Sequence, residues 1–182
     1  MADTKQIDWG DGSGEKITVT ASSFVGNKGL QIQSPENVKV TPRSKTIVLK
    51  SKTDPTKVAR INVTQQKAVY TYDFTLNASA SMIGAEGGTT RVRGTLVTYR
   101  NGVQVSSETV VPTLSGSADG FSISGDVVTA ANRGTTAGLV RRITVTGTYS
   151  DTFDGQEVSA TVVISQAANG ITRVQISILK PR

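Results

Sequence analysis

The feature that most constrains the fold is a closing phrase that occurs once in each half of the chain. Residues 59–65 read Ala-Arg-Ile-Asn-Val-Thr-Gln, and residues 160–166 read Ala-Thr-Val-Val-Ile-Ser-Gln. Each phrase is rich in β-branched residues at alternating positions and ends in a hydroxyl residue followed by glutamine. Each also follows another such stretch, at residues 46–49 or 143–146. A repeated closing hairpin is what two similar β-domains joined in tandem would produce.

Apolar and polar residues alternate along most of the chain, and no segment shows sustained helical spacing. The predicted strands are residues 17–21, 30–33, 38–41, 46–50, 58–65, 69–76, 91–100, 103–111, 121–124, 126–129, 139–149 and 157–165. Asn101-Gly102 separates two of them and predicts a tight hairpin, because both residues tolerate positive φ. We therefore expect an all-β protein of two tandem β-sandwich domains, residues 1–66 and 67–182.

Composition removes most enzymatic chemistry from consideration. The chain has no cysteine and no histidine. This excludes disulfides and thiolate nucleophiles, and it removes the usual general base near neutral pH and the commonest metal ligand. We expect no enzymatic activity, no catalytic residue, no cofactor and no metal. Only 19% of the residues are charged, below the usual level of about 25%, so Thr, Ser, Asn, Gln and Gly must carry the polar surface.

Two predicted turns of the chain are rich in acidic side chains. The glycine-rich loop 8–15 holds Asp8, Asp11, Ser13 and Glu15, an oxygen-rich set that suggests Ca²⁺, but it lacks the carboxylate that ends an EF-hand loop. A surface β-turn is the favoured interpretation. The second set is Asp151, Asp154 and Glu157 at a predicted hairpin tip, where no pocket would perturb a carboxyl group. Trp9 is expected to fill the core of the first domain.

A basic segment lies between Lys39 and Arg60, where seven cations are opposed only by Asp54. The candidate interface residues in it are Lys39, Arg43, Lys45, Lys50, Lys52 and Lys57. A solvated, like-charged sheet face is the simplest interpretation, and docking onto an acidic protein surface is the sharper one. Nucleic acid is disfavoured as a partner, because the segment has no aromatic residue for base stacking and no helix to enter a groove.

The C-terminal stretch 171–179 alternates with period two and follows a complete-looking domain. It is therefore predicted to be an extra strand that either closes its own sheet or adds to a neighbour's. Its candidate interface residues are Arg173, Val174, Ile176 and Ile178.

Two sets of motifs resemble known bacterial domains. The opening segment 8–17 and the closing segment Arg60-Ile61-Asn62-Val63-Thr64-Gln65 resemble the BACON-like immunoglobulin-type domains of Bacteroidales and their phages. Residues 128–138, Val-Thr-Ala-Ala-Asn-Arg-Gly-Thr-Thr-Ala-Gly, and the following 143–150 are similar to bacterial Ig-like repeats from the same hosts. The resemblance implies that both domains are immunoglobulin-like sandwiches.

Short proteins made of such domains resemble virion components of crAss-like phages, namely capsid decoration proteins, auxiliary capsid proteins and head-fibre parts. The resemblance implies a non-enzymatic bacteriophage structural protein that binds the major capsid protein or other virion subunits. No stretch of the sequence is long enough to span a bilayer, so we expect no membrane partner, as we expect no nucleic-acid partner. Because the first residues lack an apolar stretch typical of a secretion signal, we expect a virion component assembled in the host cytoplasm. The alternative is an adhesion module of a fibre or bacterial surface protein that binds a glycan or host surface.

Overall fold

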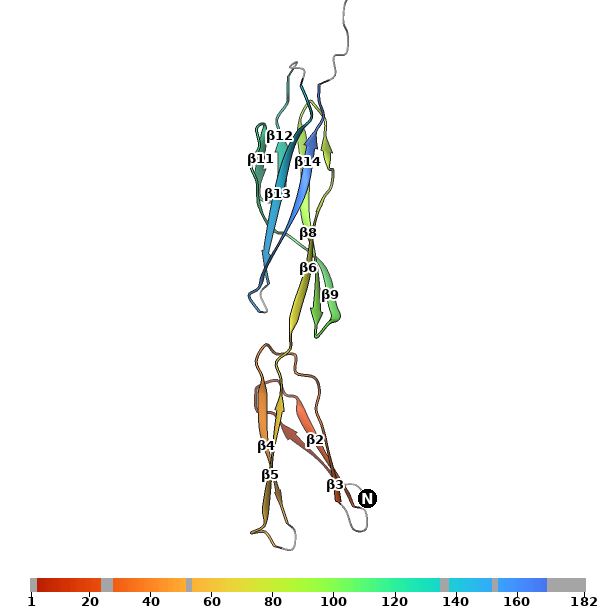
Figure 1. Ribbon diagram of the computed structural model, residues 1–182, viewed down its shortest axis with the longest axis vertical. Helices are drawn as coiled ribbons and strands as arrows, with labels where there is room; N and C mark the ends of the chain where they lie inside the picture. The colour runs from red at the N-terminus through yellow and green to blue at the C-terminus, as the bar shows by residue number, and fades with distance from the viewer. Residues whose placement is uncertain (1–2, 24–27, 52–53, 135–137, 152–153, 170–182) are drawn as a thin grey trace, which may run out of the picture. The chain divides into compact units, whose positions relative to one another are not determined.

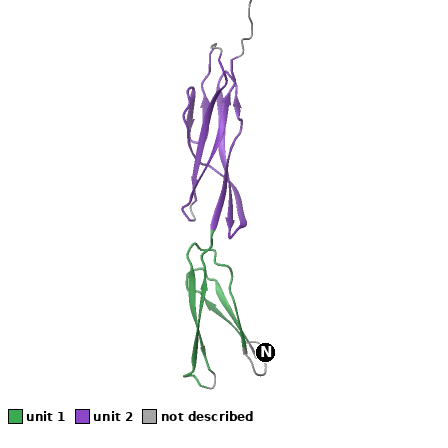
Figure 2. Ribbon diagram, viewed as in Figure 1, with its two compact units in different colours: residues 1–69 green, residues 70–182 purple. Residues whose placement is uncertain are grey.

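The structure, a computed structural model, describes residues 3–23, 28–51, 54–134, 138–151 and 154–169. Throughout these residues the regular elements are strands, and no helix occurs, so the predicted all-β class is confirmed. None of the described residues forms a helix suited to crossing a bilayer. The chain divides into two compact units, residues 1–69 and residues 70–182 (Figures 1 and 2).

Unit 1 contains two antiparallel sheets. Its strands are β1 (Asp3–Asp8), β2 (Lys16–Ser23), β3 (Lys28–Gln33), β4 (Arg43–Lys50) and β5 (Val58–Gln65). Strands β1, β2 and β3 form one sheet in that order, and β4 pairs with β5 in the other. Trp9, Ile17, Val19 and Ile47 form a buried cluster that joins the two sheets. Trp9 is 4% exposed, which confirms the expectation that it fills this core.

One predicted strand of unit 1 is wrong. Residues 39–41 form a bend, and Val38 belongs to no strand. The cause is the buried side chain of Asn37, which takes the hydrogen bonds that a neighbouring strand would supply. Its Oδ1 accepts from the backbone N–H of Lys39 (3.0 Å), and its Nδ2 donates to the carbonyl groups of Thr41 and Gln66 (2.9 Å each). An asparagine that bonds its own backbone two residues later favours a turn, whatever the alternation around it.

Unit 2 is a larger sandwich. Its strands are β6 (Tyr70–Ala78), β7 (Met82–Ile83), β8 (Gly88–Arg100), β9 (Val103–Val110), β10 (Thr113–Ser115), β11 (Phe121–Ser124), β12 (Val127–Ala130), β13 (Arg141–Ser150) and β14 (Glu157–Gln166). One sheet has the order β11-β12-β8-β6, and the other has the order β10-β13-β14-β7. With β6 as the first strand, β7 as its continuation and β9 as an addition, these are the D-E-B-A and C-F-G orders of an immunoglobulin constant-type sandwich.

The core of unit 2 lies between these sheets and contains Val92 of β8, Val128 of β12, Val145 of β13 and Ile164 of β14, each fully buried. The long strand β8 organises the unit, because β6 lies along one side of it while β12 and then β9 share the other. Asn101 (φ 50°) and Gly102 (φ 80°) make the turn between β8 and β9. The hairpin predicted at these two residues is therefore confirmed.

The repeated closing phrase forms the last strand of a hairpin in each unit. In unit 1 the register pairs Arg43, the first residue of β4, with Gln65, the last residue of β5. In unit 2 it pairs Arg141, the first residue of β13, with Gln166, the last residue of β14. Each hairpin thus ends on a cross-strand arginine–glutamine pair.

Candidate functional site

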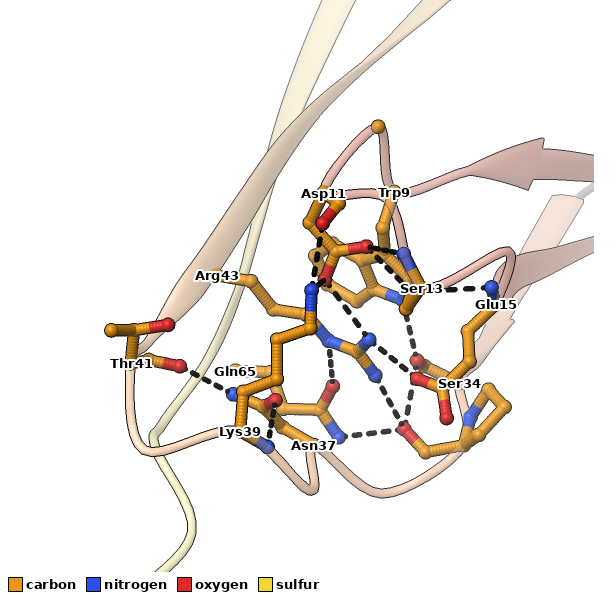
Figure 3. Close-up of polar contacts among 12 residues, drawn as sticks. Trp9, Asp11, Ser13, Glu15, Ser34, Asn37, Lys39, Thr41, Arg43 and Gln65 are labelled. Atoms are coloured by element: carbon orange, nitrogen blue, oxygen red, sulfur yellow. Dashed lines mark hydrogen bonds and ion pairs between the residues drawn. The ribbon is translucent and has the colours of Figure 1, made fainter. Parts of the chain in front are cut away.

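The most densely bonded polar region of unit 1 surrounds Arg43 (Figure 3). Alternation along β4 places Arg43 on the same face as buried Ile47, so the arginine side chain points inward and is only 5% exposed. Its Nη1 lies 2.5 Å from Glu15 Oε2 and 3.4 Å from Asp11 Oδ2. Its guanidinium carbon lies 4.5 Å from the centroid of the Trp9 ring. The buried charge is thus balanced by two carboxylates and by an aromatic face.

The remaining guanidinium donors hold the closing hairpin to the loop that follows β3. Nε donates to Gln65 Oε1 (2.9 Å), and Nη2 donates to the Pro35 carbonyl (3.1 Å). The Gln65 amide donates to the same carbonyl (2.8 Å). We call Trp9, Asp11, Glu15, Arg43 and Gln65 the Arg43 cluster. It joins three separate parts of unit 1 (Figure 3).

The acidic loop 8–15 supplies the counter-charge for this cluster. The Ser13 hydroxyl (2.5 Å) and backbone N–H (3.0 Å) both donate to Asp11 Oδ1. These bonds, together with the charges of Lys39 and Arg43, hold the pKa of the Asp11 carboxyl well below its usual range. Among the described residues no group of three carboxylate, thiol or imidazole side chains is placed to hold a metal ion. The loop is a turn whose carboxylates bind the protein's own arginine.

Three of the candidate interface residues in the basic segment belong to this inward network. Arg43 is buried, as described above. Lys39 Nζ donates to the Asp11 carbonyl (2.7 Å) and lies 3.7 Å from Asp11 Oδ2. Lys45 Nζ donates to the Trp9 carbonyl (3.4 Å). The segment is therefore not one continuous basic face, because alternation along β4 sends Arg43 and Lys45 to the inner side.

The outer side of the β4–β5 hairpin carries a different set of residues. The register places Val48 opposite Arg60 and Lys50 opposite Val58, and all four side chains are exposed. We call these four residues the basic–apolar face. Lys57 lies in the adjoining turn, 3.8 Å from Asp54 Oδ2. The other candidate interface residues, Lys52, Arg173, Val174, Ile176 and Ile178, lie outside the described residues.

The second acidic turn, between β13 and β14, is also organised internally. The Tyr72 hydroxyl of β6 donates to Asp151 Oδ2 (3.0 Å), and the backbone N–H of Asp154 donates to the same oxygen (3.1 Å). Burial, followed by hydrogen bonding to Asp154 and Asp151, raises the pKa of Tyr72 above its usual range. The turn is therefore held to β6 by a tyrosine.

An open groove of about 880 Å³ lies beside the β1–β2–β3 sheet. Four of its eight lining residues carry an amide or hydroxyl group and one is a cation; the lining consists of Gln6, Gly14, Lys16, Thr18, Ile32, Gln33, Ser34 and Pro35. The groove adjoins the Arg43 cluster, because Trp9 Nε1 donates to Ser34 Oγ (3.0 Å). Sequence reasoning missed this groove, since its residues come from three strands and two loops that only the sheet register brings together.

Sequence reasoning also missed the partnership of Arg43 with Asp11 and Glu15. A signal for it was present in the alternation of β4, because a residue four positions before an inward isoleucine must also point inward. A buried arginine then requires a carboxylate partner.

Comparison of the chain with protein-family models, curated proteins and solved structures gave no match.

Proposed function

We propose that this chain is a non-enzymatic structural protein of a bacteriophage virion that decorates a capsid lattice. The motif resemblance supports the virion class. The observation that carries a docking role is the basic–apolar face, on which Lys50 and Arg60 flank two exposed valines. The main partner would be the major capsid protein or another virion subunit.

This face has the chemistry of a protein-binding surface. Val48 and Val58 are 48% and 41% exposed, so they offer apolar area that a partner can bury. The two cations beside them suit an acidic surface, where complementary charge guides association and fixes orientation. On the opposite side of the same hairpin, Ile47, Leu49 and Ile61 pack into the core of unit 1, so the face is already ordered before a partner arrives and loses little conformational freedom on binding.

The test is co-sedimentation of the full chain with purified capsid shells that lack it. The double variant Lys50→Glu/Arg60→Glu should lose most of its occupancy. The matched control Lys5→Glu/Lys67→Glu makes the same charge change at exposed cations elsewhere in unit 1, and it should bind like the wild type. Equal binding by wild type and both variants, or equal loss from both variants, would contradict docking through this face.

The groove beside the β1–β2–β3 sheet supports a second candidate function, adhesion to a glycan. Amide and hydroxyl side chains such as Gln6, Thr18 and Gln33 are suited to hydrogen bonding with sugar hydroxyls, and Lys16 adds a site for an acidic sugar. A glycan array distinguishes the two functions. Saturable sugar binding that is lost in Gln6→Ala/Gln33→Ala would favour adhesion, whereas binding to assembled capsids without any sugar binding would favour decoration.

A further inference from the structure

Among the described strands of unit 2, β9 is the most exposed sheet edge. Within the described part of the chain it pairs with β8 alone, and seven of its eight side chains are exposed. Val103 is 67% exposed and Val105 is 45% exposed. Neither lysine nor proline, the usual protection of an edge strand, occurs in β9, and its one charged residue is Glu108. The other protective device on this edge is a β-bulge at Val105, since Thr98 pairs with Ser106 and Tyr99 with Gln104.

We propose that residues 171–178 of a second copy of this chain add to β9 as an antiparallel strand. The proposal does not depend on capsid binding. The two charges fix the register, because placing Arg173 opposite Glu108 aligns residues 171–178 with all eight residues of β9. The same register sets Ile176 opposite Val105 and Ile178 opposite Val103, so the exposed valines meet isoleucines. Opposite charges and apolar pairs directly across a sheet are both stabilising.

The chain cannot place this segment on its own β14 through a tight hairpin. Asn169-Gly170 is a hairpin signal directly after β14, but both sides of the end of β14 are already taken. Strand β13 pairs along one side, and β7 pairs with Ser165 and Gln166 on the other. The backbone N–H of Ala167 also donates to the Ile83 carbonyl (2.8 Å). The β7 side of the chain is therefore occupied one residue past the end of β14.

The chain's own β9 is out of reach in the same register. Arg133 Nη1 donates to the Ala167 carbonyl (3.0 Å) and the Asn169 amide donates to the Gly134 carbonyl, so the end of the described chain is held by the loop after β12. That loop follows Ala130, which pairs with Gly88 at the start of β8.

Glu108 pairs with Leu96, eight residues farther along β8. Eight residues of strand span about 27 Å, whereas the four residues from Asn169 to Arg173 extend at most about 14 Å. Figure 1 shows β9 at the opposite end of unit 2 from the end of β14. The donor strand in this register must therefore come from another copy.

Disulfide trapping tests the register, because the natural sequence has no cysteine to interfere. Opposed residues in an antiparallel pair have Cα atoms about 4.5–5.5 Å apart, within the range that a disulfide requires. Two full-length chains with tags of different size are mixed and oxidised, one carrying Val105→Cys and the other Ile176→Cys. The expected product is a mixed disulfide. The control pair, Val105→Cys with Thr172→Cys, shares the same face but lies four residues out of register and should give little product.

Several outcomes would overturn the proposal. Equal yields of mixed disulfide from both pairs would contradict the register that places residue 176 opposite residue 105. A predominant homodisulfide between two Val105→Cys chains would show that β9 pairs with the β9 of another copy. A single chain carrying both Val105→Cys and Ile176→Cys should not form an internal disulfide at low concentration. If it does so without forming oligomers, the strand belongs to the same molecule.

Charge exchange gives a second readout that leaves the sheet edge intact. In sedimentation velocity, Glu108→Arg and Arg173→Glu should each weaken self-association about tenfold, and the double exchange should restore it. The controls Glu157→Arg and Arg142→Glu make the same charge changes at exposed residues of unit 2 away from β9 and should leave it unchanged. Self-association that survives removal of residues 171–182, or single exchanges that the double exchange does not rescue, would contradict the proposed pairing.

Discussion

The closing hairpins of the two units end on the same cross-strand pair but bury opposite members of it. In unit 1 the arginine is buried, and Gln65 is only partly so. In unit 2 Gln166 is fully buried, and Arg141 retains 25% of its side-chain exposure. Both arginines donate to the glutamine Oε1, at 2.9 Å from Arg43 Nε and 2.6 Å from Arg141 Nη2.

The surroundings of each pair explain why the arginine is the buried member in unit 1 and the glutamine is the buried member in unit 2. Buried Arg43 carries a charge, so it needs Asp11 and Glu15 beside it. Buried Gln166 is neutral, and backbone carbonyl groups satisfy its amide, which donates to those of Gly84 (3.2 Å) and Ala131 (2.8 Å). What the two units share is therefore a register position and a hydrogen bond. The partner that ties the hairpin to the rest of the unit differs between them.

The largest loss of stability is expected when the buried arginine of unit 1 is removed. Arg43→Ala leaves Glu15 without its cation, Asp11 with Lys39 alone and Gln65 Oε1 without its donor, so we expect the free energy of unfolding to fall by about 3 kcal/mol. Gln65→Ala removes a partly exposed amide and should cost about 1 kcal/mol. Urea unfolding followed by Trp fluorescence measures unit 1, because Trp9 is the only tryptophan.

Arg60→Ala is the control for these variants, since it removes an exposed arginine from the outer face of the same hairpin. It should change stability by no more than about 0.5 kcal/mol. If Gln65→Ala destabilises unit 1 as much as Arg43→Ala, the arginine is not the member that anchors the hairpin.

In unit 2 the glutamine substitution should destabilise more than the arginine substitution, the reverse of the order in unit 1. Gln166→Ala opens a cavity and removes the hydrogen bonds from the buried amide to the Gly84 and Ala131 carbonyl groups, so a loss of about 2–3 kcal/mol is expected. Arg141→Ala should cost about 1 kcal/mol, because its side chain is partly solvated and its ion pair with Asp119 is long (4.0 Å). All four tyrosines lie in unit 2, so near-UV circular dichroism of tyrosine follows its unfolding. Exposed Gln156→Ala is the matched control, and an equal loss from Arg141→Ala would contradict the reversal.

The sequence was sufficient to predict the elements whose signals are local. Alternation identified the closing strands, and Asn101-Gly102 identified the hairpin between β8 and β9. It failed at residues 38–41, where the side chain of Asn37 overrides the alternation. The sites depend on longer-range information: the Arg43 cluster needs the loop 8–15 to meet β4, and no local pattern specifies that meeting. The alternation of β4 could show that Arg43 points inward, but it could not name the carboxylates that receive it.

The smallest expected effects concern the pH dependence of stability, which should differ between the two units. Folding lowers the pKa of Asp11, through Ser13 first and then Lys39 and Arg43. The stability that Asp11 contributes to unit 1 is therefore complete above its unfolded-state pKa of about 3.9 and is lost as the pH falls below that value. Asp11→Asn should lower the stability of unit 1 at pH 7 and reduce its further loss at acid pH. Glu157→Gln, in unit 2, is the control.

Unit 2 should respond at the other end of the pH scale. Burial and the hydrogen bonds to Asp154 and Asp151 raise the pKa of Tyr72, so its contribution is complete below its unfolded-state pKa of about 10 and is lost as the pH rises above that value. Tyr72→Phe should therefore lower the stability of unit 2 at pH 7 and flatten its decline in alkali. Urea midpoints of the Trp and Tyr signals across pH test both halves together. An alkaline decline that persists unchanged in Tyr72→Phe would show that the tie between β6 and the β13–β14 turn does not govern the behaviour of unit 2.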